Sequence, residues 1–531
     1  MVKEMKRAVP ILVTIGLVTA VAVVSALTPK ELPPTPLAQL KEQYAKKRTP
    51  SVDHSKFPQL QRAFARPQDV TSACIECHNG RHTEVMRSNH WRWEREEYVK
   101  GRGVVYLGKK NAVNNFCLAA EGNELACAKC HVGYGMESVK TFHFDDPRNV
   151  DCLVCHDGTG TYAKAQNKGG QPAPTVNLTK VAQSVGRPGR SNCGVCHFYG
   201  GGGNNVKHGD LEEAMFEPTR DVDVHMAVDG ANMQCVDCHV TEKHNIRGQL
   251  YSLSSMNRNR VTCEQCHTST PHEDDLLNEH TLKVACQTCH IPVYAKVNAT
   301  KIYWDWSTAG KLRNGKPYEE KDAEGNILYM SKKGTFRWGK NLKPEYVWFN
   351  GTAHHYLPGD RIEDPTQPVI LNRFEGSYAD PDAKIFPVKV MRTRQFYDSV
   401  TRMLLLPKLF APRQGEGALW EDFDLLRAME VGMKEHGLPF SGKMDFIETI
   451  MYWPVNHMVS PKEKALQCSE CHTRHNSRIA NLRDFYIPGR DRSPKVEAFG
   501  KGLLLLAILG VLAHGGLRVV TLWRHGKEGK R

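Results

Sequence analysis

The chain has 531 residues and a formal net charge of +13, and it contains 17 cysteines and 24 histidines. A chain of this length can hold several domains with a sizeable core. Sixteen cysteines form eight Cys-x-x-Cys pairs, each followed directly by histidine, which excludes a disulfide framework, a zinc-finger array and a cytosolic enzyme with scattered thiols. The net charge indicates an ordinary solvated surface, because the sequence has no lysine and arginine block long enough to argue for nucleic acid.

The N-terminal segment has the layout of a secretory signal. Basic residues precede an apolar stretch at residues 8–27, and Val24-Ser25-Ala26 suits signal peptidase. The stretch is also long enough to span a bilayer. Residues 1–28 are therefore expected to be either a cleaved signal peptide or a retained anchor, and both alternatives export the middle of the chain.

The eight Cys-x-x-Cys-His motifs predict covalent haem attachment. In such a motif the two thiols bind the porphyrin vinyl groups, and the adjacent histidine lies under the iron as an axial ligand. Eight covalently bound haem c groups are therefore expected, in a multihaem c-type cytochrome. The attachment cysteines are Cys74, Cys77, Cys127, Cys130, Cys152, Cys155, Cys193, Cys196, Cys235, Cys238, Cys263, Cys266, Cys286, Cys289, Cys468 and Cys471. The adjacent histidines are His78, His131, His156, His197, His239, His267, His290 and His472.

The spacing of the motifs divides the chain into sections. We expect a mainly α fold with extensive irregular loops and a minor β section, in which short helices carry the motifs. Residues 29–300 would form a haem-dense domain with haems 1 to 7. A haem-free, loop-rich and β-rich section would cover 301–415, and a helical section at 416–498 would carry haem 8.

Local patterns in the haem-free gap predict a few strands and two helices. Asn-Gly and Gly-Asn turn pairs punctuate short runs at 327–330 and 346–349, which are predicted strands. The apolar spacing from Leu419 to His436 predicts a helix that stops at Gly437. A second helix is predicted over Asp445 to Tyr452.

The C-terminal end is expected to be a membrane anchor. Residues 499–523 are apolar enough to form a transmembrane helix, and the basic residues 524–531 would remain in the cytoplasm as a tail. The rest of the protein would then lie on the periplasmic, extracytoplasmic face of the cytoplasmic membrane. His514 lies within this segment, where it either packs between helices or faces a quinone or a partner's haem.

The opposite axial ligands are expected to be histidines outside the motifs. Eight of the 24 histidines lie in motifs, and His514 and His525 lie in the anchor and the tail, which leaves fourteen for the opposite positions. Counting alone therefore does not reveal an open haem. The candidates near motifs or in apolar settings are His90, His143, His225, His244, His272, His280, His457 and His475.

Two other residues have a functional and a plain structural interpretation. Cys117 is the odd cysteine, and it either meets a sulfur substrate by thiol–disulfide exchange or is a small buried hydrophobe. Lys207 follows the glycine run 200–203, where backbone can pass close to a flat ligand and a lysine can reach the iron. Lysine ligates only when burial or the metal depresses its pKa. The local sequence alone favours the plain interpretation of both residues.

Several longer stretches together resemble the octahaem cytochromes of the tetrathionate reductase family. The similarity runs through much of residues 54–300 and returns at 445–475. The stretches are Asn114-Asn115-Phe116-Cys117, Cys130-His131-Val132-Gly133-Tyr134-Gly135, Asn149-Val150-Asp151-Cys152-Leu153-Val154-Cys155-His156-Asp157, the Gly200–Gly203 run with Lys207-His208-Gly209-Asp210-Leu211, and Tyr452-Trp453-Pro454-Val455-Asn456-His457-Met458-Val459.

The resemblance implies a catalytic haem at the second motif. Lys207 would ligate its iron in place of His131, and Cys117 would lie beside the open face. The resemblance implies a haem-dependent oxidoreductase that reduces tetrathionate, and also nitrite or hydroxylamine, with seven bis-histidine haems as the electron relay. The C-terminal anchor departs from the soluble family pattern and implies electrons arriving from the membrane, through a quinol-oxidising cytochrome b-type subunit or a small redox carrier.

Two alternatives remain open at this point. One is an electron conduit between membrane quinol oxidation and another acceptor, in which every iron is low-spin. The other is an octahaem nitrite reductase or hydroxylamine oxidoreductase, which ranks third because no motif ends in lysine and Tyr486 has the setting of a packed linker residue.

Overall fold

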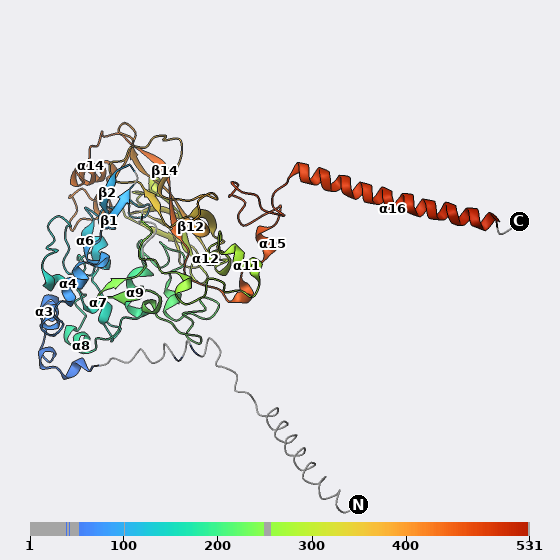
Figure 1. Ribbon diagram of the computed structural model, residues 1–531. Coiled ribbons are helices and arrows are strands. Elements are labelled where there is room, and N and C mark those ends of the chain that lie inside the picture. Colours follow the sequence, from blue (N-terminus) through green and yellow to red (C-terminus); the bar gives the residue numbers. More distant parts are fainter. Residues whose placement is uncertain (1–38, 40–41, 43–51, 100, 249–255, 529–531) are drawn as a thin grey trace, which may run out of the picture.

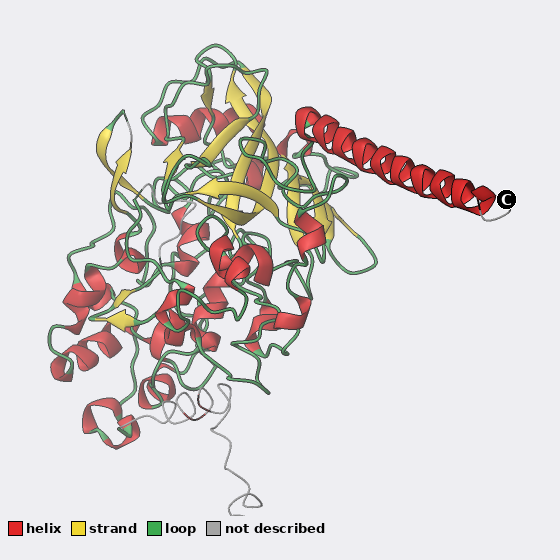
Figure 2. Cartoon of the chain, turned by 45° about the vertical axis from the view of Figure 1, so that its right-hand side comes forward, coloured by secondary structure: helices red, strands yellow, loops and turns green. Residues whose placement is uncertain are grey.

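The computed structural model describes residues 39, 42, 52–99, 101–248 and 256–528. The predicted signal or anchor at residues 1–28 lies outside the described residues. The motif-bearing part of the chain consists of short helices and irregular loops, and the upper part of the molecule in Figure 2 contains most of the strands. A long helix, α16, projects away from both parts (Figures 1 and 2).

Short helices carry most of the motifs, as the sequence predicts. The α-helices of the motif-bearing parts are α3 (Pro67–Cys77), α4 (Arg81–Met86), α5 (Asn89–Arg92), α6 (Glu124–Cys127), α7 (Leu153–His156), α8 (Leu178–Gln183), α9 (Arg190–His197), α10 (Cys235–Cys238), α11 (Asp275–His280), α12 (Cys286–His290) and α15 (Cys468–Cys471). Single 3₁₀ turns supplement them at His54–Lys56, Pro58–Leu60, Ala128–Cys130, Pro147–Asn149, Glu213–Phe216, Cys263–Gln265, Trp306–Thr308 and Lys462–Lys464. Two hairpins, β1 (Arg95–Val99) with β2 (Gly103–Leu107) and β3 (Thr241–Glu242) with β4 (Asn245–Ile246), lie among them.

The β section is larger than the sequence predicts, because it forms a ten-stranded mixed sheet. Its order is β10-β11-β14-β12-β5-β8-β7-β6, and β9 and β13 also pair with β12. The strands are β5 (Thr300–Asp305), β6 (Glu319–Lys321), β7 (Ile327–Met330), β8 (Gly334–Gly339), β9 (Glu345–Phe349), β10 (Ala353–His355), β11 (Val369–Phe374), β12 (Lys384–Asp398), β13 (Met403–Leu404) and β14 (Met444–Pro454). The two predicted runs therefore form strands β7 and β9.

The helix predicted over Asp445 to Tyr452 is wrong, because this segment is strand β14. Residues Ile447, Thr449, Met451 and Trp453 alternate as buried positions on one face, which is the period of a strand. β14 pairs along its whole length with β12, from Val388 opposite Pro454 to Asp398 opposite Met444. Pairing with β11 on one side and β12 on the other therefore overrides the local helical pattern. As a result, the sheet continues past residue 415, where the sequence predicts a section boundary.

The other predicted helix of this section forms as two pieces, α13 (Leu419–Asp422) and α14 (Leu425–Glu435). Phe423 between them has a left-handed backbone with a φ of 57°, and the Asp424 carboxylate caps α14 by accepting from the Arg427 amide at 3.0 Å. Gly437 follows with a φ of 68°, as expected for a helix stop.

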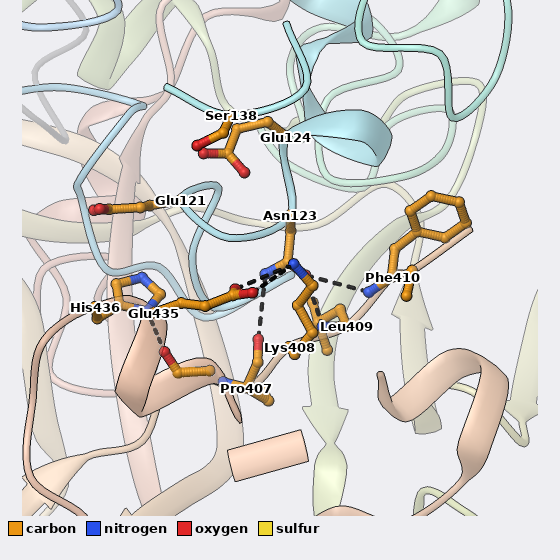
Figure 3. A network of polar contacts seen from close by, with 12 residues as sticks. Glu121, Asn123, Glu124, Ser138, Pro407, Lys408, Leu409, Phe410, Glu435 and His436 are labelled. Atoms are coloured by element: carbon orange, nitrogen blue, oxygen red, sulfur yellow. Dashed lines mark hydrogen bonds and ion pairs between the residues drawn. The ribbon is translucent and has the colours of Figure 1, made fainter. Parts of the chain in front are cut away.

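Polar contacts fix the segment between Cys117 and motif 2 against the haem-free section (Figure 3). The Asn123 side chain accepts from the Leu409 amide at 2.6 Å and the Phe410 amide at 3.2 Å, and donates to the Pro407 carbonyl at 3.2 Å. Lys408 pairs with Glu435 at the end of α14 at 3.0 Å. Because α6 begins at the next residue, Glu124, these contacts also set the position of the second motif.

Candidate functional site

Seven of the eight motif histidines lie opposite a second histidine ring. The ring centroids of all seven pairs are separated by 6.1 to 6.4 Å. In chain order of the motifs, the pairs are His78 with His54, His156 with His244, His197 with His90, His239 with His457, His267 with His225, His290 with His272, and His472 with His280.

These separations fit an iron between the two rings. A metal–imidazole bond is about 2 Å long, so an iron bound to one nitrogen of each ring places the centroids roughly 6 Å apart. Ring stacking does not explain the common distance, because the interplanar angles range from 7° to 71°.

The hydrogen bonds of the paired rings leave one nitrogen free for a metal. In six of these rings Nδ1 donates to a carbonyl or carboxylate oxygen at 2.7 to 3.1 Å, so the lone pair of the neutral ring is on Nε2. These rings are His156, His239, His244, His280, His457 and His472. Burial lowers the pKa of His197 to about 3 and so favours its neutral, ligating form.

The motifs form a connected line in space. Cysteine side chains of different motifs lie next to each other in four places, Cys74 beside Cys152, Cys193 beside Cys235, Cys263 beside Cys286, and Cys130 beside Cys196. Cys238 lies close to Cys266, Cys289 to Cys471, and Cys155 to Cys193. The order is therefore motif 1, 3, 4, 5, 6, 7 and 8, and motif 2 branches from motif 4.

The second motif is the exception to the histidine pairing. The His131 ring has no histidine opposite it among the described residues, and its Nε2 donates to the Trp91 carbonyl at 2.5 Å. Burial lowers the pKa of His131 to about 3, so the ring is neutral. His131 is thus a buried ring whose metal-binding nitrogen already has a hydrogen-bond partner.

Lys207 lies on the loop that follows motif 4, close to motif 2. Burial, with a smaller contribution from Lys109, lowers the pKa of Lys207 to about 7, so much of its amine is neutral at neutral pH. Its Nζ lies 4.6 Å from the centroid of the buried Trp453 ring. A Cβ at Gly200 would come within 3.2 Å of the lysine side chain, so the glycine run lies directly beside Lys207.

Hydrogen bonds from β12 hold both loops of this site. The Lys389 amine donates to the carbonyls of Val206 at 2.7 Å and of Lys207 at 3.0 Å, and to the Thr300 hydroxyl at 2.6 Å. On the Cys117 loop, the Asn115 amide donates to the Met391 carbonyl at 2.8 Å. The Thr393 hydroxyl donates to the Asn115 carbonyl at 2.9 Å.

Cys117 is half-buried and packs against the largest apolar cluster. Burial together with the charge of the neighbouring Cys117 raises the pKa of Cys127 to about 12, which places Cys117 beside the second motif. Leu118 adopts a φ of 70°, so the backbone turns sharply directly after this thiol.

Two lysines lie near the same region. Lys301 is 5% exposed, with its Nζ 3.4 Å from the Phe336 ring centroid, and burial holds its pKa well below the usual value. Lys109 is exposed, and the charges of the neighbouring Cys130 and Cys127 outweigh its desolvation and raise its pKa.

Two of the histidines named from the sequence lie elsewhere, and one was missed. His143 and His475 are exposed, and in the described part of the chain neither ring contacts a motif histidine. His54 instead lies opposite His78, on a 3₁₀ turn capped by Asp53. The capped turn ahead of motif 1 is the only local feature that points to His54. This histidine was missed because it lies far from the motif along the chain.

The first turn of α16 lies close to the eighth motif. α16 (Pro494–Glu528) contains the one stretch among the described residues that is long and apolar enough to cross a membrane, Pro494–Trp523, and none of its apolar window is buried. Arg474, shortly after motif 8, pairs with Glu497 in the first turns of α16 at 3.2 Å. The eighth motif therefore lies beside the base of this helix.

The chain is similar to known cytochromes. Residues 301–475 match the family model described as "Cytochrome c bacterial", and residues 192–268 match "Cytochrome c554 and c-prime". An uncharacterised protein of Archaeoglobus fulgidus is 25% identical over 244 residues, which cover 36% of this chain and 80% of the relative.

A crystal structure matches most of the chain. The octahaem cytochrome c from Shewanella oneidensis has a TM-score of 0.74 and 44% identity, over 80% of this chain and 95% of the other. With the cytochrome models, this match supports covalently bound haem c and a multihaem cytochrome c fold. The chain belongs to the octahaem cytochrome c family.

Proposed function

We propose that the chain binds eight haem c groups and that the haem at motif 2 is the catalytic one. The observation that carries this proposal is the difference between the motifs, since seven motif histidines face a partner and His131 does not. Lys207 would supply one axial ligand at motif 2, and the seven histidine pairs would ligate the other irons. Bis-histidine irons suit electron transfer, whereas an open iron suits reaction with a substrate.

The residues around motif 2 support reduction of a small inorganic substrate, with the tetrathionate anion as the preferred candidate and nitrite or hydroxylamine as others. A haem bound there would supply an open coordination position and one-electron exchange. The amine of Lys109 would offset the charge of the anion, and Cys117 would contact its sulfur atoms. Reduction of tetrathionate takes two electrons, breaks the central sulfur–sulfur bond and releases two thiosulfate ions without uptake of protons.

The order of the motifs supports an electron path from the membrane. α16 would anchor the protein with the cytochrome on the outer face of the cytoplasmic membrane, and motif 8 is tied to the base of α16 through Arg474 and Glu497. Electrons from a quinol-oxidising partner or a small carrier would enter at motif 8 and pass through motifs 7, 6, 5 and 4 to motif 2. Motifs 3 and 1 would form a side branch.

The anchor also favours a second candidate, an electron conduit to another acceptor. The two functions are separated by anaerobic stopped-flow mixing of the fully reduced protein with tetrathionate, nitrite and hydroxylamine in turn. Rapid haem reoxidation by one of them, lost in Lys207→Ala, supports the reductase and identifies its substrate. No reoxidation by any of them, with all irons low-spin in electron paramagnetic resonance (EPR), supports the conduit.

A further inference from the structure

The His131 ring lies in a closed aromatic cage. Four rings surround it, with centroids at 5.0 Å for Trp93, 5.3 Å for Trp91, 5.4 Å for Phe142 and 6.1 Å for Phe144. The histidine is 1% exposed. We call these four residues the aromatic cage. Two of the cage residues are also hydrogen-bonded to each other, since the Trp91 indole donates to the Phe144 carbonyl at 3.0 Å.

The hydrogen bonding of His131 is the reverse of that in the paired histidines. In six of the paired rings Nδ1 donates and Nε2 is free. In His131 the Nε2–H donates to the Trp91 carbonyl, and Nδ1 has no hydrogen-bond partner. The nitrogen that the other rings present to the metal is therefore occupied at motif 2 by backbone.

Gly133 leaves the space that the His131 ring occupies. A Cβ at Gly133 would lie 2.7 Å from Cε1 and 2.8 Å from Nδ1 of His131, and 3.0 Å from the Trp91 ring. Real Cβ atoms do not approach other atoms so closely, so any side chain at this position would force the His131 ring to move. The ring position and the glycine therefore depend on each other.

The backbone that closes the cage also serves the neighbouring motif. α5 contains both His90, whose ring lies opposite His197 of motif 4, and Trp91, whose carbonyl accepts from His131. The side chains of Cys130 and Cys196 are also neighbours, so motifs 2 and 4 lie side by side. Fixing His90 for motif 4 thus also fixes the carbonyl that holds His131.

We propose that the aromatic cage and the Trp91 carbonyl hold His131 away from the iron at motif 2, and that they do so through the α5 backbone that supplies His90 to motif 4. This inference rests on the proposed ligation by Lys207. The cage residues are positioning residues, because they act on the iron only through His131. Lysine ligation at motif 2 then depends on the cage as well as on Lys207.

The test compares variants in which Lys207 is absent. In Lys207→Ala the intact cage is expected to keep His131 withdrawn, so the iron at motif 2 should stay high-spin, and resonance Raman spectra of the reduced protein should show no iron–imidazole stretching band of a five-coordinate haem. In Lys207→Ala combined with Gly133→Ala or with Trp93→Leu, the released ring should bind, and this band should appear. The matched control is Lys207→Ala with Gly230→Ala, since a Cβ at Gly230 meets Ala227 at 3.2 Å and leaves the cage intact.

The outcomes separate the inference from the proposed function. Absence of the iron–imidazole band from both double variants, each carrying a full complement of haem by pyridine haemochrome assay, overturns the cage and leaves Lys207 as the ligand. An imidazole-ligated iron already present in Lys207→Ala also overturns the cage alone. Unchanged EPR line positions of the motif 2 iron in Lys207→Ala overturn both, because Lys207 would then not be a ligand.

Discussion

Replacement of Lys389 by methionine tests whether β12 sets the position of Lys207. The side chain is fully buried, and its amine makes the three hydrogen bonds to Val206, Lys207 and Thr300 described above. Three such hydrogen bonds contribute about 1 kcal/mol each. Burial of the amine costs part of this, because it holds the pKa of Lys389 well below the usual value. With an offset of about 1 kcal/mol for that burial, the variant should lose about 2 kcal/mol of unfolding free energy.

Guanidinium unfolding of the fully loaded, oxidised protein measures this loss. Lys408→Met is the control, because its partly exposed pair with Glu435 should contribute no more than about 1 kcal/mol. In the Lys389 variant the carbonyl of Lys207 also loses its donor, so the EPR lines of the lysine-ligated iron should broaden. Equal stability of the two variants, with unchanged EPR lines, would refute the role assigned to Lys389.

Three other predictions concern the relay, the ligand and the anchor. The Asp210 carboxylate accepts from Nδ1 of His457 at 3.1 Å, and Asp210→Asn removes its charge. The reduction potential of the haem at motif 5 should then rise by roughly 40 mV, or about 1 kcal/mol for one electron. A spectroelectrochemical titration with no upward shift would contradict this. Burial lowers the pKa of Lys207 from 10.5 to about 7, so the stability due to its neutral amine is complete above pH 10.5 and is lost as the pH falls through 7. The amine–iron signal should therefore decline on the acid side, and a decline confined to alkaline pH would exclude lysine. Truncation before Pro494 should release the protein from membranes with its haem content unchanged, and continued sedimentation with vesicles would show that another segment anchors it.

The sequence predicts the local parts of this protein well. A Cys-x-x-Cys-His motif is defined within five residues, so its position and short helix can be read from the chain alone. The strands β7 and β9 follow from the turn residues beside them. β14 could not be predicted in this way, because its conformation comes from pairing with β11 and β12, which are distant in sequence.

The pairing of histidines is a tertiary property, and sequence proximity is a poor guide to it. His280 and His472 lie opposite each other although 192 residues separate them. His143 and His475 lie near motifs in the sequence, yet both are exposed, and His54 occupies a place that proximity did not suggest. An imidazole becomes available for a shared metal only where the fold places it opposite a second ring, and in six of the paired rings a hydrogen bond also fixes the other nitrogen.

The site at motif 2 extends this argument to the haem-free section. Motif 2 has the same local pattern as the other seven motifs, so its difference must come from its surroundings. Lys389 on β12 holds the loop of Lys207, and Thr393 on the same strand holds the loop that precedes Cys117. Only four residues separate these two positions, and both side chains point to the same face of the strand because strand residues alternate. One strand therefore sets the distance between the proposed ligand and the proposed substrate contact, which gives the sheet a direct part in building the site.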